Sequence, residues 1–371
     1  MQFSQIPGLT ELKTQLITAF NRGKVAHAQL FSGGEGTSAL PMAMAYATFL
    51  MCENKTENDS CGTCANCVRI QKLVHPDIHL HFPKISANES KYAKVMGEAI
   101  PLFREFVMET PFGTLEDWTR KYGQENKNIL ISREDSRQML KNVSMRSVEG
   151  GFKILIIWLP EMMNPSSANA ILKILEEPPE NTIYLLVSYS YERLLATITS
   201  RTQLVTVPPN TNEEIQLFLE AQGVESEKAA QTSLLSEGKV GLAMHFSKAE
   251  ESQEYQEFQQ WMRECWGRDF ATLVKRSEDF SKSGKAAQKN RLTYSISLLR
   301  KAIIGLSGNN AGSTNEEEEK FVSTFGSKLG LAKLEKVYTQ INEAYYHLER
   351  NSNPRITHLN LSLDISRSLN S

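Results

Sequence analysis

The sequence predicts an α/β domain built on a parallel sheet, followed by helices only. In the first part of the chain, short apolar runs that suit strands alternate with helical patterns, an order typical of a parallel sheet covered on both faces. After Pro208 and Pro209 the apolar spacing is helical to the end. The 371 residues are 40% apolar and 23% charged, so the chain can bury a sizeable core.

The elements of the expected sheet domain lie on both sides of residues 84–130. A helix is expected at 9–22, and a short strand at 28–31 leads through a Gly-rich turn into an apolar helix at 39–51. A further helix at 164–180 ends at a Pro-Pro pair. The remaining strands are expected at 77–82, 152–158, 182–188 and 203–208.

Composition and the N-terminal residues exclude some classes of function. The net charge of −2 gives no overall basic field for nucleic acid, although a local basic face is still possible. The first residues have no basic region followed by an apolar core, so no signal peptide is expected. The longest apolar run, 39–51, is too short to span a bilayer. We therefore expect a cytoplasmic protein without a membrane partner.

The turn in LFSGGEGTSAL (30–40) has the position of a phosphate-binding loop but lacks its residues. A working loop reads G-x-x-x-x-G-K-[ST]: backbone N–H groups surround the phosphates, Lys reaches the β- and γ-phosphates, and the hydroxyl binds Mg²⁺. Gly33 fills the first position, and Gly36 lies within the turn. Where Gly, Lys and Ser/Thr are required, the chain has Ser38, Ala39 and Leu40. On this motif alone, a Gly-rich turn without a nucleotide role is the better interpretation.

The second element of an ATP site has lost its charges as well. In such sites an apolar strand ends in acidic residues that bind Mg²⁺ and polarise the attacking water. The run KILIIWLPEMMN places Trp158 and Leu159 there, and Glu161 lies too far beyond the strand for this role. Two independent losses indicate a degenerate nucleotide site, so we expect no ATP to bind.

Four of the five cysteines lie within sixteen residues, in the pattern C-x₈-C-x₂-C-x₂-C. In a cytosolic protein such a cluster indicates a metal rather than disulfides, and four thiolates complete a tetrahedral Zn²⁺ site. An iron–sulfur cluster or four free thiols are the alternatives. Three nearby histidines (His75, His79 and His81) are not needed as ligands. The predicted ligands of a structural zinc are Cys52, Cys61, Cys64 and Cys67.

Arg201 lies just before the last predicted strand, in the run TITSRTQ. An arginine at such a position usually forms a surface salt bridge. Its planar guanidinium can also reach across an interface to the phosphates bound by a neighbouring subunit, as an arginine finger does. The residue and its spacing leave both interpretations open.

Several motifs, taken in their order along the chain, resemble the bacterial DNA polymerase III clamp-loader subunits, which belong to the AAA+ proteins. The likeness covers 1–83 and 130–250 well and the C-terminal helices more loosely. Residues 84–130 look like an insertion. The motifs are the four-cysteine module, KVAHAQLFSG (24–33), SSANAILKILEEPPENT (166–182), LLATITSRTQ (194–203) and NSNPRI (351–356).

Within that family, gamma/tau-type subunits keep the loop lysine and the acidic pair and hydrolyse ATP. The delta-prime type has a degenerate ATP site and keeps a Ser-Arg-Cys finger motif. This chain resembles the delta-prime type, with Thr202 in place of the Cys after Ser200 and Arg201. Where ATP-binding members carry a second sensing arginine, the matching residue is Gly241.

The resemblance implies three domains. They are an AAA+-like nucleotide-binding fold with a degenerate site over 1–208, a helical lid over 209–250, and a helical collar for oligomerisation over 251–371. The first domain carries the zinc module 52–67 and the insertion around 84–130.

The implied function is that of a delta-prime subunit in a DNA-directed DNA polymerase holoenzyme during DNA replication. It would have no ATPase activity of its own, would supply Arg201 in trans, and would help load the sliding clamp. Its expected partners are the gamma/tau and delta subunits, the clamp and, through the complex, primer–template DNA. The alternatives are an ATP-hydrolysing gamma/tau-type subunit and a zinc-dependent nucleic-acid-binding protein.

Overall fold

The structure is a computed structural model that describes residues 1–124, 129–248, 252–306, 316–350 and 352–370. The chain divides into two compact units. The α/β unit comprises Met1–Phe218 and Ser236–Leu242, and the helical unit comprises Leu219–Leu235 and Ala243–Ser371.

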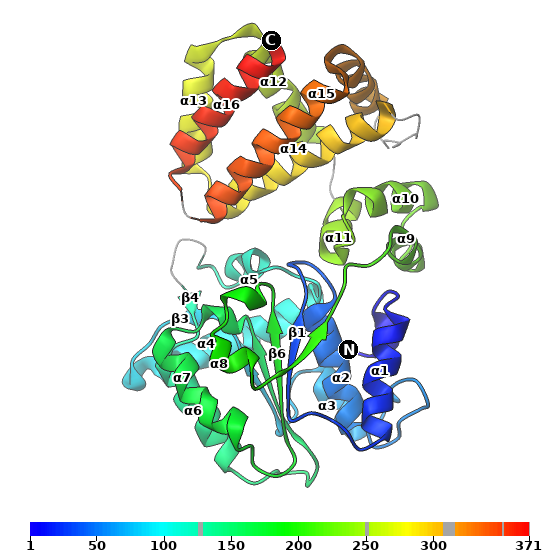
Figure 1. The fold of residues 1–371 in the computed structure, drawn as a ribbon, viewed down its shortest axis with the longest axis vertical. Helices are drawn as coiled ribbons and strands as arrows, with labels where there is room; N and C mark the ends of the chain where they lie inside the picture. The colour runs from blue at the N-terminus through cyan, green and yellow to red at the C-terminus, as the bar shows by residue number, and fades with distance from the viewer. Residues whose placement is uncertain (125–128, 249–251, 307–315, 351, 371) are drawn as a thin grey trace. The chain divides into compact units, whose positions relative to one another are not determined.

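A sheet of five parallel strands forms the centre of the α/β unit, in the order β2-β5-β6-β1-β7 (Figure 1). Each strand lies close to its predicted range. The residues of β5 and β6 are all buried, which explains why these segments are almost continuously apolar. The strands are β1 (Ala28–Ser32), β2 (Ile78–His81), β5 (Lys153–Trp158), β6 (Thr182–Ser188) and β7 (Gln203–Thr206).

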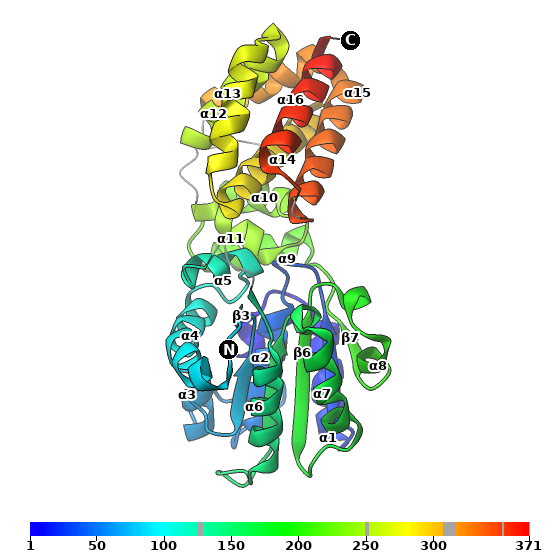
Figure 2. The same cartoon turned by 90° about the vertical axis from the view of Figure 1, so that its left-hand side faces the viewer.

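Helices cover both faces of this sheet, as Figure 2 shows from the side of α6 and α7. Alternate strand residues belong to different hydrophobic clusters: Phe31 packs on the side of α2, whereas Leu30 packs on the side of α6 and α7. These observations confirm the predicted α/β class. The helices are α1 (Thr10–Asn21), α2 (Ala39–Met51), α3 (Ala65–Gln71), α6 (Arg133–Ser144), α7 (Pro165–Glu176) and α8 (Ala196–Thr199).

Residues 84–130 begin and end in a two-stranded antiparallel ribbon, β3 (Lys84–Ile85) and β4 (Ile129–Leu130). Between its strands lie α4 (Glu89–Glu109) and α5 (Leu115–Lys121). The longer of the two, α4, has Pro101 inside the helix. The ribbon was not expected, because two-residue strands are too short to show a periodicity.

An aromatic cluster joins α4 and α5 to the sheet. Phe103 of α4 stacks on Phe82 with ring centroids 3.8 Å apart, and both rings meet Trp118 of α5 edge-on. Phe103 and Phe106 also pack against Trp158 at the end of β5, with centroids 5.5 and 5.6 Å away. The segment 84–130 therefore shares one core with the sheet.

The helical unit has its own core, formed by residues from α12 to α16. This confirms the helical pattern expected after residue 250, and α15 contains a kink at Gly330, whose φ is +73°. The remaining helices are α9 (Asn212–Ala221), α10 (Ser226–Leu235), α11 (Val240–Lys248), α12 (Ser252–Gly267), α13 (Phe270–Lys282), α14 (Lys285–Leu306), α15 (Glu316–Glu349) and α16 (Pro354–Asn370). Three short 3₁₀ helices lie in the α/β unit: Phe3–Gln5, Pro160–Met162 and Tyr191–Arg193.

Among the described residues, no helix has both the length and the apolar character needed to cross a bilayer.

Candidate functional site

The Gly-rich turn connects β1 to α2, as the sequence predicts. The N–H of Gly33 donates to the carbonyl O of Ser188 at 3.2 Å, and a Cβ at Gly33 would collide with the hydroxyl of Thr37. That hydroxyl donates to Gly34 O at 2.7 Å, and Gly36 has a φ of +77°, which favours glycine. The tight turn is therefore fixed by its own bonds and by its neighbouring strand, which explains why its frame is glycine-rich.

The three residues that replace the phosphate-binding ones are buried: Ser38, Ala39 and Leu40 are at most 2% exposed. The Ser38 hydroxyl donates to Oδ1 of Asn210 at 3.1 Å, and the Asn210 amide donates to Pro7 O at 2.8 Å. Ala39 and Leu40 start α2, whose residues are all buried. These positions therefore serve packing, and their side chains offer phosphate neither a positive charge nor a free hydroxyl.

The end of β5 presents no exposed acid. Trp158 is buried, and its Nε1 donates to the hydroxyl oxygen of Tyr189 at 3.1 Å. Leu159 adopts a left-handed conformation, with φ +58°. Glu161 points inward: Oε1 accepts from the Tyr189 N–H at 2.9 Å, Oε2 has no partner, and burial raises the pKa of this carboxyl group. The strand end is therefore built for packing rather than for Mg²⁺.

Gly241, the expected position of a sensing arginine, lies against the Gly-rich turn. Its N–H donates to Gly36 O at 2.9 Å. A Cβ at Gly241 would overlap with the carbonyl O of Phe112. The backbone approach leaves no room for a side chain at this position, and an arginine there would require the neighbouring segment to move.

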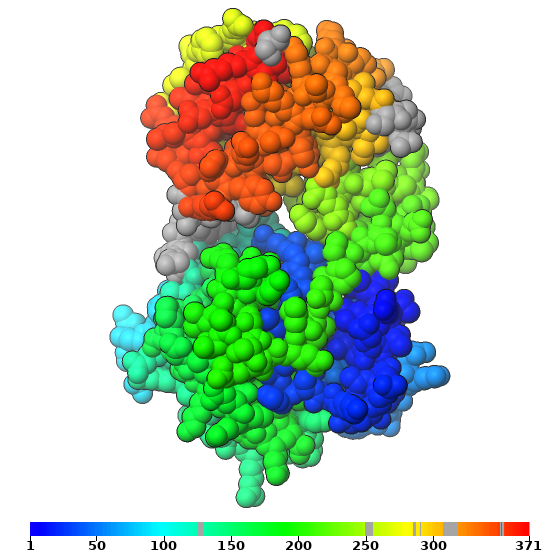
Figure 3. Space-filling view, viewed as in Figure 1, coloured from blue at the N-terminus to red at the C-terminus, as the bar shows by residue number. Residues whose placement is uncertain are grey.

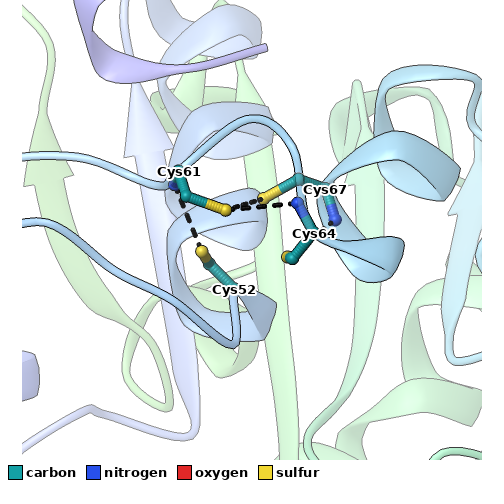
Figure 4. A group of neighbouring side chains, drawn as sticks. All are labelled: Cys52, Cys61, Cys64 and Cys67. Atoms are coloured by element: carbon teal, nitrogen blue, oxygen red, sulfur yellow. Dashed lines mark hydrogen bonds between the residues drawn. The ribbon is translucent and has the colours of Figure 1, made fainter.

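The four clustered cysteines converge at the other end of α2 (Figure 4). Cys52 caps the C-terminus of α2, and Cys64 caps the N-terminus of α3. The four sulfur atoms lie within 4.8 Å of one another. Tetrahedral zinc with bonds of about 2.3 Å places its sulfur ligands roughly 3.8 Å apart, so the donor set fits zinc. The four residues are Cys52, Cys61, Cys64 and Cys67.

Backbone N–H groups orient the sulfur atoms. The Cys61 N–H donates to the sulfur of Cys52 at 3.2 Å, and the Cys64 N–H donates to that of Cys61 at 3.3 Å. The amides of Thr63 and Cys64 lower the pKa of Cys61 to about 6, which favours the thiolate. Burial raises the pKa of Cys67, so a cation would be needed to keep this deeper sulfur ionised.

The N-terminal residues lie on this cysteine cluster. Backbone N–H groups of Phe3 and Ser4 donate to the two oxygens of Asp59 at 3.0 and 2.9 Å. The Gln2 side chain donates to Ser60 O at 2.6 Å. The loop that carries Cys61 is therefore held by the N-terminal residues as well as by the hydrogen bonds to the cysteine sulfur atoms.

Arg201 lies on the turn between α8 and β7. Its Nε donates to Oε1 of Glu176 at 2.6 Å, Nη2 forms an ion pair with the same oxygen, and Nη1 donates to Thr197 O at 2.9 Å. The side chain is 33% exposed. The segment that contains α7 and α8 lies on the face drawn in Figure 3. The guanidinium is thus accessible and held by one exposed carboxylate.

The structure brings the two parts of the degenerate site together, because Trp158 and the Gly-rich turn lie at the same end of the sheet. Arg201 and the cysteine cluster are separate features. Sequence reasoning missed Glu35, Tyr189 and Asn210, which bind neighbours of the degenerate site. No motif could have identified them, since each is a single polar residue whose partner is distant in sequence.

Comparisons with known proteins agree with the resemblance. A family model described as "DNA polymerase III, delta subunit" matches residues 8–211. The tau subunit of Escherichia coli (strain K12) is 28% identical over 199 residues, which cover 54% of this chain and 24% of that protein. Subunit delta' of the same strain is 25% identical over 231 residues, covering 62% of this chain and 57% of the relative. Subunit delta' of Bacillus subtilis (strain 168) is 27% identical over 210 residues, with coverages of 56% and 50%.

The matched part of the chain therefore spans about a quarter of the tau subunit and about half of the delta' subunits. The family model itself covers more than half of the 371 residues. The chain belongs to the DNA polymerase III delta-subunit family.

Proposed function

We propose that this chain is a delta-prime-type subunit, which takes part in loading the sliding clamp without hydrolysing ATP. The observation that carries this proposal is the burial of Ala39 and Leu40, which occupy the positions of the lysine and the Mg²⁺-binding hydroxyl. The inward orientation of Trp158 supports it independently. The relatives include both tau and delta' subunits, so the site rather than the comparison favours the delta-prime type.

In this proposal Arg201 is an arginine finger for an ATP-bearing neighbour. Its bond to Glu176 is an exposed ion pair, and such pairs contribute about 0–1 kcal/mol. A neighbour's γ-phosphate carries more charge than one carboxylate and accepts a bidentate bond, so it can replace Glu176 as the partner. The expected partners are the gamma/tau and delta subunits, the clamp and, through the complex, primer–template DNA. In this proposal residues 251–371 assemble the ring, and the complex acts in the cytoplasm.

The proposed metal is a structural Zn²⁺ held by the four clustered cysteines. When bound, the ion cross-links the end of α2 to the start of α3. The chain's own residues complete the site: amides orient the sulfur atoms, and Asp59 ties the N-terminal residues to the loop. The site lies at the end of α2 opposite the Gly-rich turn, so the proposed role of the metal is structural.

Substitution of Arg201 in the reconstituted complex tests the proposal. Arg201→Ala is expected to leave assembly intact and to lower DNA- and clamp-stimulated ATPase activity and the rate of clamp loading. Arginine fingers in well-studied GTPases raise the rate of hydrolysis roughly 10³–10⁵-fold. A ring with several ATP sites should lose a smaller part of its total ATPase rate. Arg201→Lys should also be impaired, because an ammonium cannot reproduce the planar fork.

Glu176→Gln is the matched control, since it removes the same ion pair from the other side. ATPase activity near that of the wild type is expected for this variant. Equal losses in Arg201→Ala and Glu176→Gln, or no loss in an assembled Arg201→Ala complex, would reduce Arg201 to a surface salt bridge. Separately, titration with a fluorescent ATP analogue and Mg²⁺ should show no binding to the isolated chain, and a micromolar affinity would favour the gamma/tau-type alternative.

A further inference from the structure

The four residues Phe112–Leu115, which lie between α4 and the first turn of α5, reach the Gly-rich turn and Gly241 and, through Tyr189, Trp158. We propose that they act as an internal plug, which closes this site and holds it in one conformation without a nucleotide. The plug extends the proposed function, because it gives residues 84–130 a role in a subunit that does not use ATP. Only the role given to residues 84–130 rests on the proposed function, because the contacts of the plug do not depend on clamp loading.

The first contact reverses the usual polarity of a phosphate loop. The N–H of Leu115 donates to Oε1 of Glu35 at 3.1 Å. Leu115 is the first residue of α5, where N–H groups have no acceptor within the helix. A phosphate loop normally offers N–H groups to an anion. Here the loop offers a carboxylate, and the plug supplies the N–H group.

The second contact joins the plug to the end of β5. The hydroxyl of Tyr189 donates to Gly113 O at 3.2 Å and accepts from Nε1 of Trp158 at 3.1 Å. Trp158 occupies the position where an ATPase would carry its acidic pair. The part-buried hydroxyl of Tyr189 thus connects Trp158 to the plug.

The third contact explains Gly241. Its N–H binds Gly36 O, and the space where its Cβ would lie is filled by the carbonyl O of Phe112. The φ of Gly241 is not in the left-handed region, so close approach rather than backbone conformation requires glycine here. A sensing arginine could return to this position only if the plug moved.

Charge favours the plug over a nucleotide. The Gly-rich turn carries the carboxylate of Glu35, and the carboxylate of Asp117 accepts from the Thr114 N–H of the plug at 2.9 Å. The nearby Lys239 is paired with Glu237 at 3.5 Å. Phosphates placed here would meet the negative charge of Glu35, whereas the Leu115 N–H of the plug donates to it.

Hydrogen exchange of the Leu115 amide in the full chain tests the plug. In the wild type this amide should be protected, although it begins a helix. Glu35→Ala removes the acceptor and should accelerate its exchange about tenfold or more. Glu35→Gln is the matched control: its amide oxygen can still accept, so exchange should stay close to that of the wild type.

A second pair of variants leaves Glu35 in place. Gly241→Ala should push Phe112 away and accelerate exchange at Leu115 about tenfold. Gly97→Ala in α4 introduces the same methyl group into open space and should leave exchange unchanged. A wild-type Leu115 amide that exchanges at the rate of an exposed residue would overturn the plug, as would insensitivity to both Glu35→Ala and Gly241→Ala.

These outcomes are distinct from failure of the proposed function. Free exchange at Leu115 combined with no binding of the ATP analogue refutes the plug alone. Micromolar, Mg²⁺-dependent binding of the analogue by the wild type refutes the ATP-independent function, and with it the closed site.

Discussion

The two ends of helix α2 carry the two candidate ligand sites of the α/β unit, and their side chains differ in character. At its N-terminus, the Gly-rich turn keeps its shape while Ala39 and Leu40 are packed into the core. At its C-terminus, Cys52 and three further cysteines keep their sulfur atoms within 4.8 Å of one another. The Gly-rich turn thus has a backbone shape that supports packing but lacks the side chains that bind phosphate, whereas the cysteines form a set of side chains that could hold a metal ion.

The burial of α2 explains why both ends keep their shape. Its thirteen residues are all buried, and it contacts β1, β5 and β6. A change in the path of the chain at either end would disturb this packing, which is as dense as in an organic crystal. Ala39 and Leu40 can lack phosphate-binding groups without disturbing this packing, because both are compact, buried apolar side chains.

Loss of one cysteine is expected to have the largest effect. Cys67→Ser should reduce the metal content from about one zinc per chain to nearly none, because zinc needs the fourth thiolate. Hydrogen exchange should become faster in 52–67 and in the N-terminal residues bound to Asp59, while β1 and β6 stay protected. Elemental analysis and exchange mass spectrometry measure both effects.

Cys265→Ser is the matched control, since this buried cysteine belongs to the core of the helical unit. Its zinc content should equal that of the wild type. Iron with visible absorbance, or four freely titrating thiols without metal in the wild type, would contradict the zinc assignment and remove the contrast between the two ends of α2.

Truncation of Trp118 should have the next largest effect and should leave the cysteine end of α2 unchanged. Trp118 is fully buried, and its Nε1 donates to Pro83 O at 2.8 Å. Trp118→Ala should lower the free energy of unfolding by about 3–5 kcal/mol. Trp118→Phe keeps a ring but leaves the carbonyl unpaired, and should lower it by about 1–3 kcal/mol. Denaturant unfolding measures both losses, and the zinc content should stay unchanged as the control. A loss below about 1 kcal/mol in Trp118→Ala would show that the aromatic cluster is not a core shared with the sheet.

The smallest expected effect concerns Glu161 at the end of β5. Burial raises its pKa above the ordinary 4.5, so its favourable contribution is complete below about pH 4.5 and is lost as pH rises through the raised pKa. Glu161→Gln removes this loss of stability. The difference in free energy of unfolding between variant and wild type should therefore shift in favour of the variant by on the order of 1 kcal/mol from pH 4.5 to pH 8. Denaturant unfolding of both proteins at the two pH values tests the sign of this change in stability. A variant that is less stable than the wild type only at pH 8 would contradict it and show that the carboxylate charge is needed there.

The sequence by itself determined the features that depend on neighbouring residues. The strands that became β1, β5 and β6 are apolar runs, and hydrophobic periodicity depends only on local order. The cysteine spacing likewise indicated a metal site, since each C-x₂-C pair forms one local turn. Loss of the charged positions at 39 and 158 was visible in the sequence because both motifs are contiguous.

Only the tertiary structure decided which residues surround the Gly-rich turn. The ribbon β3–β4 and the plug contacts were not predicted, and Glu35 binds Leu115 across 80 residues. Ser38 and Asn210 are 172 residues apart, and Tyr189 lies 76 residues from Gly113. Such contacts leave no periodicity or spacing in the sequence, because tertiary packing rather than the order of residues along the chain brings the partners together.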